Sequence, residues 1–168
     1  MDEGPFEIER KFLIKYPDMD LLRARAQGSQ IVQTYLRRPE KGRSARVRKR
    51  GCGGAWTYTH TVKEKINDMR RLEIEREITE EEYLELLKDA DPSRRTICKE
   101  RWCYEYRNQL FEIDIFPFWQ DKAVMEIELS DEMQPVLFPP EIEIIKEVTG
   151  DKRYTNSSIA KHIPEETF

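Results

Sequence analysis

Short segments in which apolar and charged residues alternate recur along most of this chain. Residues 7–14 (EIERKFLI) and 71–78 (RLEIEREI) show the pattern clearly. Because successive side chains of a β-strand point to opposite faces, a period of two predicts strands with one apolar face and one charged face. Together with less regular neighbours, the pattern predicts eight strands, at residues 7–14, 31–37, 44–50, 55–65, 71–78, 96–106, 110–116 and 122–129.

Helix signals are fewer, and most have a recognisable start or stop. Pro17 and Gly28 bound one short segment, and Thr79 with Glu82 three residues later makes a capping box. The expected helices are residues 18–27, residues 80–90, residues 140–149 before Gly150, and a short final helix that Asn156 or Ser157 caps and that reaches His162. Residues 39–42 and the glycine-rich residues 51–54 predict turns between strands.

The charged residues of these strands are sorted by sign. The acidic couples, at every second position, are Glu7/Glu9, Glu73/Glu75, Glu112/Asp114 and Glu126/Glu128, and the basic couples are Arg46/Arg48 and Lys99/Arg101. Paired glutamates on one face repel each other, and glutamate is a poor strand former. A set of ordinary solvent-facing surfaces is therefore a weak explanation for the repetition.

Closing the sheet on itself accounts for both faces. In an eight-stranded barrel the inward positions alternate with outward ones, so the charged faces can line the lumen while the apolar faces pack under helices. We therefore predict an α+β fold, with a closed eight-stranded antiparallel β-barrel, a charged lumen and flanking helices. One domain is expected to span residues 1–168.

Composition narrows the class of protein. Lys and Arg number 29 and Asp and Glu 33, together 37% of 168 residues, yet the net charge is only −4. This balance argues against a nucleic-acid partner bound through bulk positive charge. No apolar run approaches the ~18–20 residues of a membrane span, no secretory signal is recognisable, and the three cysteines lack metal-ligand spacing. We expect a cytoplasmic monomer or homodimer without a membrane partner.

A lumen with charges of both signs suits a particular kind of ligand. Clustered carboxylates bind hard cations such as Mg²⁺ or Mn²⁺ through oxygen, whereas Arg and Lys bind phosphate oxygens. A polyphosphate needs both, because its negative charge can be shared between the cations of the protein and a metal ion. The candidate chemistry is therefore phosphoryl transfer.

The motifs that carry these charges resemble the CYTH superfamily, the triphosphate tunnel metalloenzymes. The chain has ExExK at 7–11, RxR at 46–48, TxK at 61–63, RxExE at 71–75, KxR at 99–101 and acidic couples at 112–114 and 126–128. The motifs come in the order of the family, and residues 153–157 are similar to its final segment. The resemblance implies a tunnel that binds a triphosphate and hydrolyses or cyclises it with Mg²⁺ or Mn²⁺.

The resemblance also implies a role for each matching residue. Tyr35, within a QxYL segment, would pair with Lys11 near the reacting phosphate, and Glu73 and Glu75 join these two as the implied catalytic residues. Glu73 and Glu75, with Glu112 in a supporting role, would orient the cations or a metal-bound water. The implied metal-binding acids are Glu7, Glu9, Glu126 and Glu128, with Asp114 as a helper. The implied phosphate-binding cations are Lys11, Arg46, Arg48, Lys63, Arg71, Lys99 and Arg101.

Metal-dependent hydrolysis of inorganic triphosphate is the leading hypothesis, with nucleoside triphosphates as further candidate substrates. A class IV-type adenylyl cyclase and a thiamine triphosphatase are alternatives on the same scaffold. An alternative of another class is a non-catalytic module that binds a phosphate ligand or a nucleotide. The four carboxylate couples argue against this last class, because an anion binder has no need of them.

Overall fold

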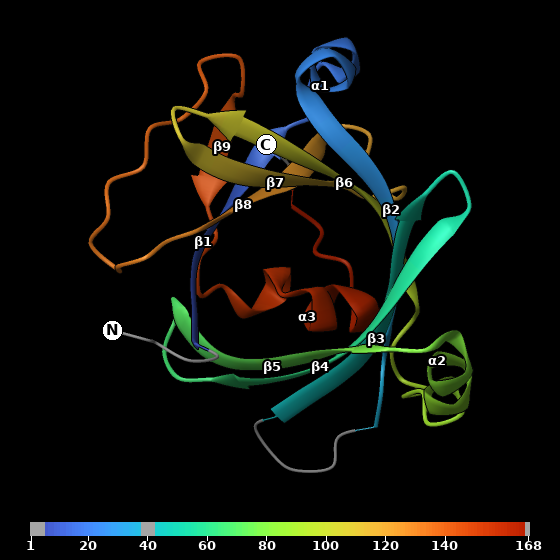
Figure 1. Cartoon of the computed structure of the whole chain (residues 1–168). Coiled ribbons are helices and arrows are strands. Elements are labelled where there is room, and N and C mark those ends of the chain that lie inside the picture. Colours follow the sequence, from blue (N-terminus) through green and yellow to red (C-terminus); the bar gives the residue numbers. More distant parts are fainter. Residues whose placement is uncertain (1–5, 38–42, 167–168) are drawn as a thin grey trace.

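A computed structural model describes residues 6–37 and 43–166 of the chain, and its strands form a closed ring around a central helix (Figure 1). The turn expected at residues 39–42 lies outside the described residues. The elements, in chain order, are β1 (Phe6–Lys15), α1 (Met19–Arg25), β2 (Ala26–Tyr35), β3 (Arg43–Cys52), β4 (Ala55–Lys65), β5 (Arg70–Ile78), α2 (Glu80–Leu87), β6 (Ile97–Tyr106), β7 (Gln109–Ile115), β8 (Lys122–Glu128), β9 (Ile144–Glu147), the 3₁₀ helix η1 (Lys152–Tyr154) and α3 (Asn156–Lys161).

Eight antiparallel strands make the barrel, as the sequence predicts. They follow the order β5-β4-β3-β2-β6-β7-β8-β1, and a short pairing of β1 with β5 closes the ring. On β1, residues 6–8 pair with β5, and residues 9–15 pair with β8 along the opposite edge. The β3–β4 hairpin turns at Gly53 and Gly54, whose φ angles of 63° and 85° suit glycine.

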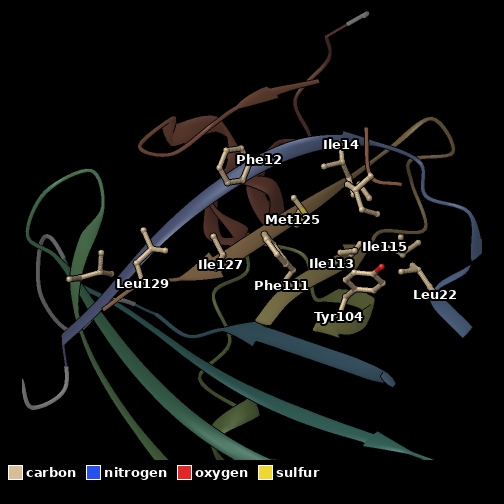
Figure 2. Close-up of a cluster of buried hydrophobic side chains, with 13 residues drawn as sticks. Phe12, Ile14, Leu22, Tyr104, Phe111, Ile113, Ile115, Met125, Ile127 and Leu129 are labelled. Carbon is tan, nitrogen blue, oxygen red and sulfur yellow. The ribbon is translucent and has the colours of Figure 1, made fainter. Parts of the chain in front are cut away.

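The largest apolar cluster lies on the outside of the barrel, over β1, β6, β7 and β8 (Figure 2). Its residues come from the outward positions of these strands, such as Ile113, Met125 and Ile127, which are almost fully buried. Leu22 of α1 covers this face at one side, and the ring of Phe138 packs edge-on against Phe12 at 5.0 Å between centroids. Each such side chain contributes roughly 1.5–3 kcal/mol when it is fully buried.

A second apolar cluster fills one end of the barrel interior. Leu13 and Val124 occupy inward positions of β1 and β8, and Ile159 and Ala160 of α3 pack against this cluster. Figure 1 shows α3, in red, inside the ring of strands. The interior is therefore apolar at one end, and the charged positions of the same strands lie beside it.

The helix α2 covers a third region, over the outer face of β3 and β4. Its Tyr83 packs with Val47 and Ile78, and the hydroxyl of Thr79 accepts a hydrogen bond from the backbone N–H of Glu82 at 3.1 Å, as the capping box predicts. Among the helices of residues 6–37 and 43–166, none has the length and apolar character that crossing a bilayer requires.

The helix predicted at residues 140–149 is wrong, because the structure has the strand β9 at Ile144–Glu147. β9 pairs with residues 12–14 of β1, along the edge that β5 leaves after residue 8. The open N–H and C=O groups of that edge require partners, and β9 supplies them. The carboxylate of Glu147 also accepts two hydrogen bonds from the guanidinium of Arg10, at 2.6 and 3.0 Å.

The boundaries of the other three helices differ from the prediction as well, and α2 ends at Leu87 rather than at residue 90. α1 ends at Arg25, and the following residues begin β2. Gly28 lies within this strand, and a glycine suits the position because a Cβ there would come within 2.8 Å of the Trp102 ring. The cap of α3 is Thr155 rather than Asn156 or Ser157, since its hydroxyl accepts a hydrogen bond from the N–H of Ser158 at 3.1 Å.

Candidate active site

A cavity of about 650 Å³ occupies the charged part of the barrel interior. Most of the residues singled out from the sequence line this cavity: Glu7, Glu9, Lys11, Tyr35, Arg46, Arg48, Lys63, Arg71, Glu73, Glu75, Arg101, Glu112, Glu126 and Glu128. Lys99 and Asp114 do not line it. The alternation of the strands therefore brings charged residues from seven strands to one enclosed space.

One wall of the cavity is acidic, because the register of β1, β8 and β7 places carboxylates side by side. Glu9 lies opposite Glu128 on β8, and Glu126 lies opposite Glu112 on β7. Partial burial, followed by the negative charges of Glu112, Glu9 and Glu126, raises the pKa of Glu128. These carboxylates repel one another, so a cation bound between them would be stabilised.

The wall formed by β3 is basic. Burial, together with the positive charges of Arg46 and Arg101, lowers the pKa of Arg48 to about 9. The side-chain oxygen of Gln33 on the adjacent β2 accepts hydrogen bonds from Arg48, at 2.9 and 3.2 Å. The Nε of Arg46 is buried and has no hydrogen-bond partner in the described part of the chain. The β3 wall therefore has donor capacity left for an anionic ligand.

β4 and β5 contribute charges of both signs. Burial and the nearby Arg46 lower the pKa of Lys63 to about 7. The nearest carboxylate oxygen of Glu73 is 4.0 Å from the Lys63 ammonium, while the hydroxyl of Thr61 donates a hydrogen bond to Glu75 at 2.8 Å. Lys63 is thus a cation whose charge the surrounding acids offset only in part.

Lys99 and Asp114 form a buried group in the barrel interior next to the cavity, where Asp114 lies opposite Val124 of the inner apolar cluster. Asp114 accepts hydrogen bonds from the Lys99 ammonium at 2.7 Å and from Arg101 at 2.8 and 3.0 Å. Burial alone would raise the pKa of Asp114, but the charges of Arg101 and Lys99 hold it well below its usual range. In the structure Asp114 therefore fixes two cations, of which Arg101 reaches the cavity and also contacts Glu112 at 2.8 Å.

Lys11 and Tyr35 both reach the cavity but have different partners. The Lys11 ammonium lies 3.3 Å from Glu126 and donates to the backbone carbonyl of Tyr154 at 3.2 Å. The hydroxyl of Tyr35 accepts a hydrogen bond from Gln33 at 3.3 Å. The pairing of Tyr35 with Lys11 stays a prediction.

Sequence reasoning missed several residues that line the cavity. Arg50 continues the alternation of Arg46 and Arg48, so the pattern itself could have identified it. Residues 148–152 and 155–158 line the cavity as well, including Thr149. Nothing in the local pattern places this segment inside the barrel, because its position follows from the docking of β9 and α3.

The acidic wall fits a divalent cation by donor chemistry, since its oxygen ligands are crowded and one of them has a raised pKa. In the structure these acids form ion pairs with neighbouring cations instead: Glu9 lies 2.8 Å from Arg71, and Glu126 contacts Lys11. Accordingly, the described residues contain no group of three or more His, Cys, Asp or Glu side chains arranged to hold a metal ion. Small side-chain movements would have to bring the acids together.

Comparisons with known proteins point to one family and one fold. A CYTH domain model matches residues 5–138. The inorganic triphosphatase of Nitrosomonas europaea is 33% identical over 161 residues, which cover 94% of this chain and 99% of that protein. The inorganic triphosphatase of Acetivibrio thermocellus is 34% identical over 157 residues, covering 93% and 94%. The crystal structure of the inorganic triphosphatase NE1496 matches with a TM-score of 0.59 at 30% identity, covering 95% of this chain and 97% of that one.

Proposed function

The chain belongs to the CYTH domain family, and from that premise we propose that it is a metal-dependent hydrolase of inorganic triphosphate. Two of its relatives with this name are about one third identical over nearly the whole chain. The charged lumen, which the alternation of the strands creates, supports the same activity.

One observation carries the proposal: the cavity holds cations and carboxylates that each lack a full counter-charge. Burial lowers the pKa of Lys63 and raises that of Glu128, and neighbouring like charges add to both shifts. A triphosphate supplies negative charge to the cations, and its metal ion supplies positive charge to the acids. A single metal–triphosphate complex would therefore stabilise both walls at once.

The composition of the cavity lining favours inorganic triphosphate over a nucleotide. Among the described residues that line the cavity, Tyr35 is the sole aromatic residue, and Val148 is the sole aliphatic one. Trp56, Trp102 and Trp119 do not line it. A nucleotide base is usually held by stacking on aromatic or apolar side chains, which this lining offers at few points.

In this proposal the residues of the two walls have different tasks. Arg46, Arg48 and Lys63 bind phosphate oxygens and offset the charge that develops on the leaving diphosphate. Lys11 contacts the phosphate that reacts. When bound, a divalent cation such as Mg²⁺ or Mn²⁺ polarises the phosphate chain and supplies or orients the attacking water.

The acidic residues also have different tasks. We propose Glu7, Glu9, Glu126 and Glu128 as the residues that hold the metal ion. Glu73 and Glu75 orient Lys63 and Thr61, and Glu112 orients Arg101. Asp114 acts through Lys99 and Arg101, because three hydrogen bonds to these cations already occupy its carboxylate.

A phosphate-release and product assay tests the function. Purified protein is incubated with inorganic triphosphate, ATP or thiamine triphosphate, in Mg²⁺, in Mn²⁺ and in excess chelator. We expect rapid release of phosphate from triphosphate, much slower release from the other two, and no release in chelator. Glu9→Gln should lower turnover at least ~100-fold, since it removes a proposed metal ligand worth several kcal/mol.

The control is Glu100→Gln, which makes the same chemical change on the strand β6 at a residue that does not line the cavity. It should keep wild-type turnover. Formation of cyclic AMP from ATP would overturn the proposal in favour of the adenylyl cyclase. Faster hydrolysis of thiamine triphosphate than of inorganic triphosphate would overturn it in favour of the thiamine triphosphatase. Tight triphosphate binding without any turnover would indicate a binding module.

We also propose that residues 1–168 act as one domain, because residues 148–152 and 155–158 line the same cavity as the strands. The three cysteines, Cys52, Cys98 and Cys103, are free, which supports the expected cytoplasmic location. A monomer or homodimer remains the expectation, and light scattering of the purified protein would distinguish them.

A further inference from the structure

Lys11 is held by one segment of the chain at three points. Its backbone N–H donates to the hydroxyl of Thr149 at 2.9 Å, and its carbonyl accepts from the N–H of Val148 at 2.8 Å. Its ammonium donates to the backbone carbonyl of Tyr154 at 3.2 Å. The direction of the Lys11 side chain therefore depends on where residues 148–154 lie, and above all on the Tyr154 carbonyl.

The far side of this segment is tied by one carboxylate, that of Glu166. It accepts a hydrogen bond from the Tyr154 hydroxyl and forms ion pairs with Arg153 at 2.5 Å and with Lys146 of β9 at 2.9 Å. The chain that leads to it is anchored too, since Ile163 packs against the inner apolar cluster. Glu166 thus joins β9, η1 and the buried ring of Tyr154.

The charge state of this contact supports a fixed geometry. The hydrogen bond from Tyr154, followed by those from Lys146 and Arg153, lowers the pKa of Glu166 to about 2. Burial and the neighbouring Glu166 carboxylate raise the pKa of Tyr154. The carboxylate is therefore ionised and the phenol protonated throughout the neutral range, so the bond between them persists.

We infer that Glu166 is a positioning residue for Lys11. Glu166 fixes the Tyr154 side chain and η1, and the Tyr154 carbonyl then fixes the Lys11 ammonium within the cavity. The inference rests on the proposed function, in which Lys11 contacts the reacting phosphate. Glu166 itself does not line the cavity and so acts without touching the substrate.

The variants that test this role are Glu166→Gln and Tyr154→Phe. The second removes the hydroxyl that Glu166 accepts from but keeps the ring and the backbone carbonyl. The matched control is Glu165→Gln, at the adjacent and exposed residue. We expect kcat for triphosphate to fall about tenfold in both test variants, with KM within about twofold of wild type. The expected decrease in kcat is smaller than the ~100-fold decrease in rate that follows when a reacting group is displaced by 1 Å.

A second measurement does not depend on turnover. The proteins are treated briefly with acetic anhydride well below their melting temperatures, and acetylation of Lys11 is compared with that of exposed Lys15 on the same strand by peptide mass spectrometry. We expect the Lys11-to-Lys15 ratio to rise several-fold in Glu166→Gln and Tyr154→Phe, and to stay at the wild-type value in Glu165→Gln.

The outcomes separate the two proposals. If wild-type protein fails to hydrolyse triphosphate, the proposed function fails, and the acetylation ratio still decides whether Glu166 positions Lys11. If Glu166→Gln lowers the melting temperature but leaves the ratio unchanged, the residue has a merely structural role and the inference is overturned. An unchanged kcat in an active enzyme overturns it as well.

Discussion

At the scale of the residue, the inward charges are of two kinds. Glu128 and Lys63 face the cavity with their charge only partly compensated, and their pKa values are shifted toward the neutral form. Asp114 instead lies in a buried group with Lys99 and Arg101, and Arg101 also pairs with Glu112. Substitution should therefore affect ligand chemistry at the first kind and folding at the second.

Asp114→Asn should lower the free energy of unfolding by about 3–5 kcal/mol. The change leaves Lys99 and Arg101 buried without a full negative counter-charge, and breaking a buried pair has about this effect. Denaturant unfolding in chelator measures it. A metal ligand would give a different result, in which metal affinity falls while the stability of the metal-free protein is retained, and that result would return Asp114 to the metal site.

Glu128→Gln should reduce turnover about 100-fold without lowering the melting temperature of the metal-free protein. Its raised pKa means that the ionised carboxylate is less favourable in the folded state than in the unfolded state, so at neutral pH its charge lowers stability. Calorimetry in chelator and the phosphate assay measure the two effects, with Glu100→Gln as the control. A melting temperature that falls together with the activity would contradict the prediction.

At the scale of the element, tertiary contacts decided what local patterns left open. The sequence predicts a helix for the residues of β9, but they form a strand because β1 has an open edge beyond its contact with β5. The helix α3 has only six residues, too few to be stable alone, and its buried side chains inside the barrel provide its stability. The capping box at Thr79 and the glycine turn at residues 51–54, in contrast, depend on neighbouring residues and were predicted correctly.

Ile159→Ala should lower the free energy of unfolding by about 2–5 kcal/mol, because Ile159 of α3 is almost fully buried inside the barrel. The matched control is Ile74→Ala on β5, whose side chain is 56% exposed and whose truncation should change stability by less than about 0.5 kcal/mol. Urea unfolding compares the two. Equal effects would mean that α3 does not stabilise the barrel interior.

At the scale of the whole molecule, the near-balance of charge has a structural meaning. The chain has a net charge of only −4, and the lining of the cavity is balanced as well, with nine acidic and ten basic residues among those described. Other acids tie the C-terminal segment and the loops to the barrel through ion pairs, of which Glu166 is the main example. Protonation of such acids should loosen the molecule.

The free energy of unfolding should fall as the pH is lowered from about 4.5 to 2. The pKa of Glu166 drops from 4.5 to about 2 on folding, so its contribution to stability is complete above pH 4.5 and is lost as the pH falls through the folded value. Denaturant titrations at several pH values measure this slope. Glu166→Gln should flatten it, Glu165→Gln should not, and equal slopes in both variants would refute the assignment.

The amino-acid pattern alone sets the two faces of each strand, because a period of two fixes which side chains point together whatever the strands pair with. That rule placed most of the predicted charges in the cavity and indicated the closed barrel. The position of each residue along the inner face, and its partners there, depend on the fold: Asp114 has the right parity, yet the strand register sets it opposite Val124 at the apolar end, where it binds Lys99 rather than lining the cavity. The register also left open the edge that β9 fills, and so brought Tyr154 to Lys11. Local sequence cannot contain such contacts, because the groups that make them lie far apart in the chain.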